Sequence, residues 1–377
     1  MTRTLALLLA LLLTTACSPA PDASLSAVAE SAEPSATEAT EEGMHGQVAF
    51  VAGMDPQIYL LDLATGESRQ LTRLAPEHAE LRAEGPMRPV LSCGFGPISL
   101  AWSPDGSMLA FAYGGCETVL YIVDLDGELT RVADGRSPAW SPDGTRLVFS
   151  PNTPFCVDAA GCGEPPAPGA WSLQVVDVAD GGPEPLSLDP TLVSAGQPHF
   201  SSDGSLIAFT GPLPRGEAEP EVFGAAYVMA EDGSNARLVA RGAWSPGWLP
   251  DGRMLIVDED TGDVHAIDLE TTESTSLGGD AGPAVASPDG SRLLLTRSDP
   301  ETGEMSVVLS TIDGEAVARI AGYPAAWAPD SRAAVIFESD EDGAALIFVG
   351  RNGEALGRYA VPHAANASNT AAWRPGT

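Results

Sequence analysis

The stretch "SPAWSPDG" at residues 137–144 returns as "SPGWLPDG" at residues 245–252, and "AWSPDG" also stands at residues 101–106. In each copy a large aromatic ring precedes a tight Pro-Asp-Gly sequence. The aspartates of six such copies, spaced 38 to 60 residues apart, are Asp105, Asp143, Asp203, Asp251, Asp289 and Asp330. Repetition at a period of ~40 residues indicates a fold assembled from similar small units.

Two apolar segments follow each copy. After Asp105 they are "MLAFAY" (108–113) and "VLYIVDLDG" (119–127). Aliphatic and β-branched runs bounded by Gly, Asp and Pro predict strands. Within the turn, Pro presets the backbone of the second position, Asp suits the third, and Gly takes the left-handed conformation. The hexapeptide therefore joins two strands as a short hairpin, and we expect its aspartate to be architectural rather than catalytic.

An aromatic ring stands at the same place before the turn in all units but one. Rings of this size bury ~150–250 Å² each and suit the space between neighbouring sheets. They are Trp102, Trp140, Phe200, Trp248, Trp327 and Trp373. In one copy Ala286 takes the ring position, and in the next Ser331 replaces glycine. We expect these two units to be the least rigid.

The two ends of the repeat array complement each other. The segments 47–53, 58–67 and 69–73 look like three strands without the aromatic strand that should precede them, whereas "AAWRPG" (371–376) is an aromatic strand without followers. Joined, they make one composite sheet, and closure of this kind hides the sheet edges. Residues 46–377 are therefore predicted to form an all-β, seven-bladed β-propeller of six complete blades and one composite blade, with six or eight blades as alternatives.

The repeated unit resembles a known family. The Trp-Ser-Pro-Asp-Gly unit, with strands like "LIAF" (206–209), is similar to the WD40-like repeat of TolB-type β-propellers, which prolyl-oligopeptidase-type propellers also contain. The resemblance covers residues 46–377. It implies the fold and not one activity, because propellers support unrelated functions. TolB has an α/β domain before its propeller, where this chain has an acidic segment.

The N-terminal residues look like an export signal. Arg3, the apolar run Leu5–Leu13 and "TTAC" at Thr14–Cys17 resemble a bacterial lipoprotein signal, in which residues 1–16 are removed and Cys17 receives the lipid. Residues 17–45 carry six acids and no base, which predicts a disordered linker. We expect the protein to be lipid-anchored in the bacterial cell envelope, at the outer membrane.

The charge balance restricts the partners. There are 52 acidic residues against 19 basic ones, a net charge of −33, and every basic residue is arginine. The absence of lysine excludes a phosphate-loop lysine and a Schiff base. A chain with this much negative charge repels nucleic acid and anionic lipid surfaces. We therefore expect no nucleic-acid partner, and membrane contact only through the N-terminal lipid. A monomer is expected.

One face of the predicted propeller is more elaborate than the other. The long connections 74–97, 151–169 and 212–223 all belong to it. So do Cys93, Cys116, Cys156 and Cys162, which predict two disulfides in an exported protein. Cys156 and Cys162 can close a small loop, which leaves Cys93 and Cys116 to pair. A four-cysteine metal site is the alternative, but it lacks paired CxxC spacing.

Three histidines fall in connections of the same face. His78, His199 and His363 could bind a ligand or hold a metal, as in propeller-type polysaccharide lyases, although exposed loop histidines are the simpler interpretation. Acidic turns such as 257–263 offer oxygen ligands for Ca²⁺, but none has the spacing of an EF-hand. We therefore expect no cofactor. The Gly-x-Ser-x-Gly elbow of serine hydrolases is absent from the sequence.

Two functions remain open from the sequence. The first is a non-enzymatic envelope lipoprotein whose disulfide-braced loop face binds another protein or a cell-wall component. The alternative is a glycan-binding or glycan-active propeller that uses the channel mouth. Long loops on a rigid scaffold are where binding usually occurs, which favours that face in either case. The sequence itself identifies no ligand.

Overall fold

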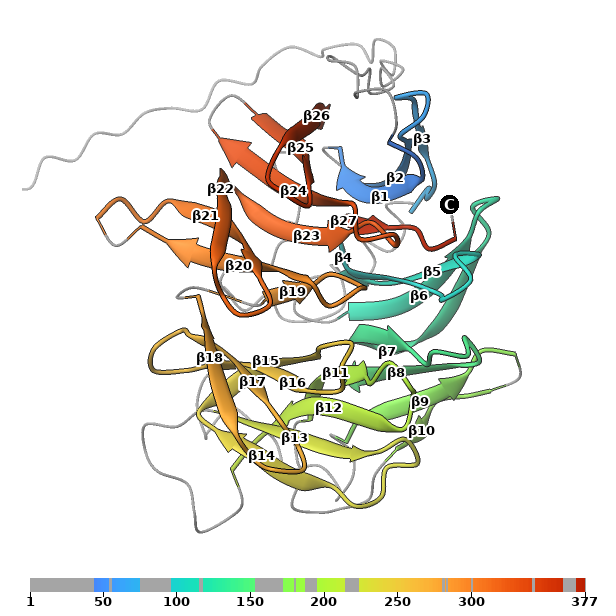
Figure 1. Cartoon of the computed structure of the whole chain (residues 1–377). Helices are drawn as coiled ribbons and strands as arrows, with labels where there is room; N and C mark the ends of the chain where they lie inside the picture. The colour runs from blue at the N-terminus through green and yellow to red at the C-terminus, as the bar shows by residue number, and fades with distance from the viewer. Residues whose placement is uncertain are drawn as a thin grey trace, which may run out of the picture. The chain divides into compact units, whose positions relative to one another are not determined.

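The computed structural model describes residues 44–53, 56–74, 96–114, 118–152, 172–179, 181–186, 195–213, 224–279, 282, 284–299, 301–340, 343–361 and 371–376. All described residues belong to one compact unit, Pro34–Thr377. Their regular elements are strands (Figure 1). No helix among the described residues is long and apolar enough to cross a membrane.

The first sheet joins the two ends of the repeat array. Its order is β27-β1-β2-β3, and its strands are β1 (Gln47–Ala52), β2 (Gln57–Asp62), β3 (Ser68–Gln70) and β27 (Ala371–Trp373). Val48 faces Trp373 and Phe50 faces Ala371 in antiparallel register. The C-terminal aromatic strand thus supplies the missing strand of the N-terminal sheet, as expected from the sequence.

The next sheet is a fusion of two units. It runs β10-β9-β8-β7-β6-β5-β4 and contains β4 (Gly96–Trp102), β5 (Met108–Gly114), β6 (Thr118–Asp124), β7 (Leu129–Trp140), β8 (Arg146–Pro151), β9 (Gln174–Asp177) and β10 (Glu184–Pro185). The first half of β7 pairs with β6 through Asp134, and the second half pairs with β8 from Gly135 onward. One long strand therefore ends one repeat and begins the next.

Four further sheets have four antiparallel strands each. Two contain β11 (Gly196–Phe200), β12 (Leu206–Gly211), β13 (Ala225–Ala230) and β14 (Arg237–Arg241), then β15 (Ala243–Trp248), β16 (Met254–Asp258), β17 (Val264–Ile267) and β18 (Ser274–Gly278). The other two contain β19 (Ala284–Ala286), β20 (Arg292–Ser298), β21 (Met305–Thr311) and β22 (Ala316–Ala321), then β23 (Tyr323–Trp327), β24 (Ala333–Asp340), β25 (Gly343–Gly350) and β26 (Ala355–Val361).

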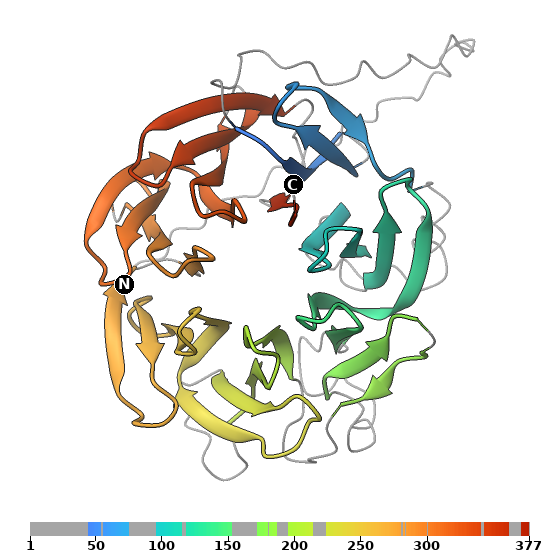
Figure 2. The same cartoon turned by 45° about the vertical axis from the view of Figure 1, so that its right-hand side comes forward.

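The sheets follow one another around a ring. Figure 2 shows the first strand of each sheet on the inner side and the last strand outside. Two ends of the sheets can then be defined by residues. The turn end carries the six Pro-Asp-Gly-type turns at Asp105, Asp143, Asp203, Asp251, Asp289 and Asp330. At the loop end the inner strands begin, and Gly135 there pairs with Pro151, the last residue of β8.

The hydrophobic core lies between neighbouring sheets. Val48 and Phe50 of β1, for example, pack in one cluster with Val335 and Phe337 of β24 and with Trp373. Burial of side chains of this size contributes about 1.5–3 kcal/mol each. A phenylalanine recurs at the centre of the strand after the turn and is fully buried at Phe50, Phe111, Phe149, Phe209 and Phe337.

One junction has smaller core side chains than the others. Between the sheet β11–β14 and the sheet β15–β18, the cluster contains Ala208, Ala226 and Ala243 packed against Met254 and Ile256. Elsewhere the corresponding clusters contain phenylalanine, leucine or tryptophan. Since small side chains fill less space, this junction is the place where cavities are expected.

The predicted weak point at Ser331 has a specific contact. Ser331 adopts a φ of 61°, in the left-handed region that glycine occupies in the other copies. Its side chain is buried, and its Oγ accepts a hydrogen bond of 2.9 Å from the backbone N–H of Asp289 in the preceding sheet. The departure from the motif therefore adds a bond between two sheets.

Candidate functional site

The aromatic rings do more than fill space. Trp102 Nε1 donates to Ala372 O at 3.1 Å, and Trp140 Nε1 donates to Ala101 O at 2.9 Å. The corresponding bonds of Trp248 and Trp327 go to His199 O at 2.9 Å and Val285 O at 3.0 Å. In each case the acceptor is the residue just before the ring position of the preceding repeat unit. These four indoles therefore fasten their units to the ones before them.

Each of the six aspartates at the turn end accepts hydrogen bonds from groups of its own turn. The Asp143 carboxylate accepts hydrogen bonds from Ser141 Oγ at 2.5 Å and from the backbone N–H of Thr145 at 3.0 Å. The same arrangement recurs with Ser103 and Asp105, Ser201 and Asp203, and Ser287 and Asp289. The hydroxyl of Ser141 and the groups of Thr145 lower the pKa of Asp143 to about 2. The pKa values of Asp105, Asp203 and Asp289 are also lowered, so these carboxylates hold their hairpins and are poor proton donors at neutral pH.

Successive turns also pack on one another around the turn end. A Cβ on Gly144 would lie 3.5 Å from the ring of Pro104, one on Gly204 would lie 3.2 Å from Pro142, and one on Gly290 would lie 3.4 Å from Pro250. The glycine of one copy is thus seated against the proline of the previous copy. These glycines also need a positive φ, for example 72° at Gly144, so their place in the motif has two reasons.

Four inner strands share a β-bulge near their start. The register shifts between Ile98 and Ala101, Arg136 and Ala139, Gly196 and His199, and Trp244 and Gly247. The bulged residue has a φ of 49–56° in these four strands, at Ser99, Ser137, Gln197 and Ser245. A non-glycine residue held in this conformation costs of order 1–3 kcal/mol, and such residues gather where side chains are aimed at ligands. The bulges are therefore candidate functional features.

The bulges present a group of exposed side chains on three consecutive inner strands. Arg136 lies on β7, Gln197 and His199 on β11, and Trp244 on β15. All four are exposed, and Trp244 is 36% exposed, one of two large hydrophobic side chains among the described residues that are so accessible. Tryptophan and arginine are the residues that most often dominate binding interfaces. We call these four residues the inner-strand group.

His199 is the one member of the predicted histidine set that the structure describes. Its side chain is exposed on the inner side of the ring, but protein surrounds it, and desolvation lowers its pKa below 6.5. The imidazole is therefore neutral at pH 7, the form that binds metals and accepts hydrogen bonds. His78 and His363 lie outside the described residues, as do Cys17, Cys93, Cys116, Cys156 and Cys162. Of the predicted ligands, the described part of the chain therefore contains His199 alone.

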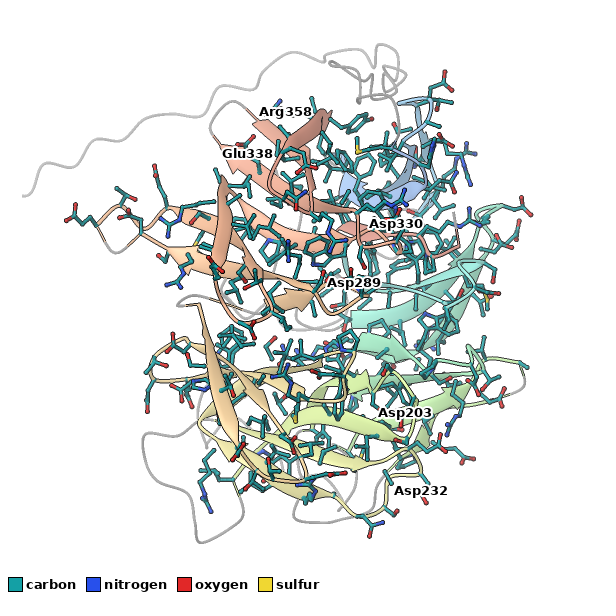
Figure 3. All side chains as sticks on the ribbon, in the orientation of Figure 1. Asp203, Asp232, Asp289, Asp330, Glu338 and Arg358 are labelled. Carbon is teal, nitrogen blue, oxygen red and sulfur yellow. The ribbon has the colours of Figure 1, made fainter. Side chains whose placement is uncertain are left out.

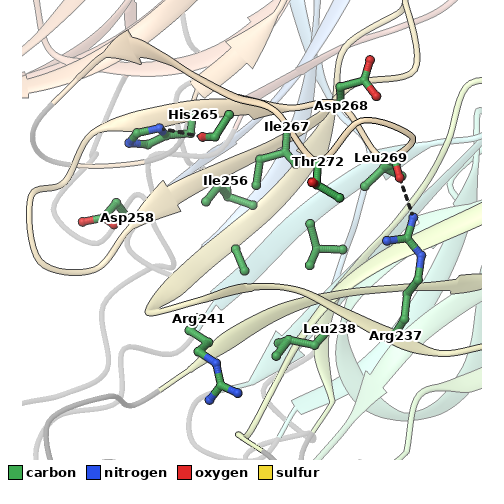
Figure 4. A pocket seen from close by; sticks show the side chains of 13 residues that line it. Arg237, Leu238, Arg241, Ile256, Asp258, His265, Ile267, Asp268, Leu269 and Thr272 are labelled. Carbon is green, nitrogen blue, oxygen red and sulfur yellow. Dashed lines mark hydrogen bonds between the residues drawn. The ribbon is translucent and has the colours of Figure 1, made fainter.

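A separate groove opens on the outer side, between β14 and the sheet β15–β18. It has a volume of about 290 Å³ and is shown in Figure 4. Arg237 and Arg241 of β14 line one side, and His265 and Asp258 line the other. Arg237 is held by a bond of 3.3 Å to Leu269 O, and His265 Nδ1 lies 3.1 Å from Ser274 Oγ. The two arginines of this groove did not stand out in the sequence, because charged residues are common on edge strands.

The comparisons agree with this architecture. No protein-family model and no curated protein matches the sequence. Among solved structures, oligogalacturonate lyase in complex with manganese is 20% identical, with a TM-score of 0.58 over 84% of this chain and 89% of that one. A prolyl endopeptidase is 18% identical, with a TM-score of 0.56 over 85% of this chain and 49% of that one. TolB from Acinetobacter baumannii is 15% identical, with a TM-score of 0.49 over 88% of this chain and 67% of that one.

The fold is a β-propeller. The all-β propeller class predicted from the repeats is thereby confirmed, and all the described regular elements are strands. The chain spans about half the length of the prolyl endopeptidase that it matches. Among the residues that the structure describes, no group of three or more His, Cys, Asp or Glu side chains is arranged to hold a metal ion. In this propeller the inner-strand group is the candidate functional site.

Proposed function

We propose that this propeller is a binding module of the bacterial cell envelope, anchored by a lipid on Cys17. Its partner is another protein or a component of the cell wall, recognised at the loop end. The support for the location is the signal-like N-terminus and the set of four cysteines expected in an exported protein. The support for binding is the inner-strand group.

The propeller is proposed to have seven blades. The support is the pairing register, in which β7 contributes one half to β4–β6 and the other half to β8–β10. Counted as two, these halves join the composite sheet and the four remaining four-stranded sheets. The six complete motif copies and the clipped copy at Trp373 lead to the same number.

The observation that carries the proposal is the exposed pair of Arg136 and Trp244 at equivalent places of two inner strands. Arg136 pairs with Ser150 and Trp244 pairs with Val257, in both cases just before the bulge. An indole offers a large contact area and a guanidinium offers several hydrogen-bond donors. With Gln197 and His199 between them, these side chains form a surface suited to recognition rather than to proton transfer.

The proposal is tested by binding to isolated envelope fractions. The full-length lipoprotein, the double variant Arg136→Ala/Trp244→Ala and the control Val317→Ala are compared. Val317 is 38% exposed on the outer strand β22, so it matches Trp244 in accessibility and differs in place. Retention of one stoichiometric partner by the parent and by the control, and its loss from the double variant, supports the proposal. Equal retention by all three contradicts the assigned surface.

A glycan-binding or glycan-active propeller is the second candidate. The observation that favours it is the neutral, exposed imidazole of His199 on the inner side of the ring. A similar solved structure is an oligogalacturonate lyase in complex with manganese. Manganese binding and oligogalacturonate cleavage are measured for the parent and for His199→Ala and His363→Ala. Loss of both on replacement, with the fold intact, favours this candidate, and absence of both from the parent excludes a lyase of that kind.

A further inference from the structure

The series of packed turns is interrupted at one junction. The motif copy at residues 199–204 reads "HFSSDG", with Ser202 where the neighbouring copies have proline. In the following sheet, a Cβ on Gly252 would meet nothing within 4 Å, although its counterparts Gly144, Gly204 and Gly290 are seated on a proline. This is the junction with the alanine-rich core. Because the proline ring is missing at Ser202, the turn at Asp203 does not pack against Gly252 of the next turn.

A cavity occupies this place at the turn end. It has a volume of about 600 Å³, and its walls include Ser202 and Asp203 of one turn and Trp248, Pro250 and Gly252 of the next. The turn between β17 and β18 closes the third side with Asp268, Leu269 and Glu270. Asp203, labelled in Figure 3, lies in the turn between β11 and β12. The cavity is thus lined by an indole, by the uncovered backbone of Gly252 and by several carboxylates.

The same place at another junction of this molecule is filled by a guanidinium. Where the composite sheet meets the next one, Arg374 follows the ring position as Ser201 does in its own sheet. Its Cζ lies 6.0 Å from the centroid of the Trp102 ring, and its Nε donates to Gly106 O at 2.7 Å. Trp102 and Gly106 correspond in the motif to Trp248 and Gly252. The molecule therefore shows how an arginine fits against this pair of groups.

The charges around the cavity favour a cation. Asp203, Asp251, Asp268 and Glu270 line it, and Arg253, paired with Asp251 at 2.8 Å, offsets one of them. The hydroxyl of Ser201 lowers the pKa of Asp203, and the backbone N–H of Thr271 lowers that of Asp268. The carboxylates of Asp203 and Asp268 are therefore ionised throughout the physiological range. A guanidinium placed over the Trp248 ring would also gain a cation–π interaction.

We propose that this cavity is a docking site for an arginine side chain presented by a partner protein. The guanidinium stacks on Trp248, donates to the carbonyl of Gly252 and lies among the carboxylates of Asp203, Asp268 and Glu270. Arginine suits the site better than lysine because its planar group can stack and donate at the same time. The chain's net charge of −33 attracts a partner that carries such basic residues. The site is at the opposite end of the sheets from the inner-strand group, so it adds a second interaction surface.

The test uses N-acetyl-arginine amide as the probe, with ligand-detected NMR titration of the full chain. N-acetyl-citrulline amide is the neutral control of the same shape, and N-acetyl-lysine amide tests for a general cation site. We expect saturable binding of the arginine probe and at least tenfold weaker binding of the other two. Equal binding of arginine and citrulline overturns the proposal. Equal binding of arginine and lysine also overturns it, because the site then recognises charge alone.

Two variants locate the binding. Ser202→Pro restores the proline of the other copies, so we expect it to fill the cavity, abolish probe binding and leave the melting temperature equal or higher. Glu270→Gln removes one wall charge and should weaken binding about two- to fivefold, the usual size of one partly exposed charge interaction. Glu315→Gln, in the corresponding exposed turn between β21 and β22, is the control and should bind as the parent does. Unchanged binding by Ser202→Pro contradicts the assigned cavity.

Discussion

The indole Nε1 of Trp102 donates a hydrogen bond to the carbonyl oxygen of Ala372, which lies 270 positions later in the chain. Ala372 is in β27, and β27 is paired with β1, so this bond ties the composite sheet to the sheet that begins with β4. Arg374 Nε donates to Gly106 O across the same junction, and its Nη1 donates to Gln47 Oε1 of β1 at 2.6 Å. The two ends of the repeat array are therefore fixed to each other and to the next sheet.

The indole bonds predict an asymmetry between two tryptophans. Trp102→Phe keeps most of the ring and removes the donor, leaving Ala372 O without it, so we expect a loss of about 1 kcal/mol in the free energy of unfolding. Trp373 is the matched control because its buried Nε1 has no hydrogen-bond partner. Trp373→Phe should cost less than Trp102→Phe in urea unfolding. Equal costs would mean that the indole bonds do not stabilise the ring.

The turn carboxylates predict acid sensitivity. The folded-state pKa of Asp143 is about 2, below its usual 3.8. A carboxyl group whose pKa is depressed in the folded state contributes stability that is complete above about pH 5 and declines as pH falls from there toward 2. Asp143→Asn should therefore reduce the difference in stability between pH 6 and pH 3. Asp313→Asn, in an exposed turn, is the control, and urea midpoints at the two pH values measure both variants.

The buried hydroxyl of Ser331 predicts that replacing this serine lowers the free energy of unfolding, although Ser331 itself departs from the glycine of the motif. Ser331→Ala retains the backbone conformation but leaves the N–H of Asp289 without its acceptor, so a loss of about 1–3 kcal/mol is expected. Ser310 is the control, because its hydroxyl is buried without a partner. Ser310→Ala should be neutral or stabilising. Thermal unfolding of the two variants distinguishes the contribution of this bond from that of burying a serine.

The missing ring at Ala286 predicts local opening. The sheet β19–β22 begins with an inner strand of three residues and has no aromatic side chain at the ring position, so no indole donates from it to the preceding sheet. We expect the amides of β19 to exchange with solvent faster than those of β15. Hydrogen exchange followed by mass spectrometry measures this. Slower exchange in β19 than in β15 would contradict the expectation that this unit is the least rigid.

Much of the fold could be predicted because its determinants are local. The turn sequence around Asp143, the ring of Trp140 and the strand that follows are contiguous, and their repetition is visible without neighbours. The bonds from Trp140 to Ala101 and from Trp248 to His199 could not be predicted, since each acceptor belongs to the preceding repeat unit. Ser202 is plain in the sequence, but its consequence appears only when Gly252 is seen without a proline beside it.

The candidate site was less accessible to prediction for a physical reason. The β-bulges change which side of the inner strand faces the ring interior, so alternation in the sequence does not reveal that Arg136 and Trp244 are exposed. The paired Ser-Pro sequences before Trp140 and Trp248 were the available signal, because they mark the bulges at Ser137 and Ser245. The disulfides, the lipid at Cys17 and the roles of His78 and His363 remain predictions.

The central claim is that the C-terminal strand closes the ring against β1. Amide hydrogen exchange of the C-terminal peptide that covers residues 371–376 tests it most directly, because Arg374 N–H donates to Gln47 O at 2.8 Å and β27 forms a ladder with β1. Closure predicts protection of these amides comparable to that of β12, at the centre of its sheet. Exchange at the rate of an unstructured peptide would show that the ring is open and would contradict the account.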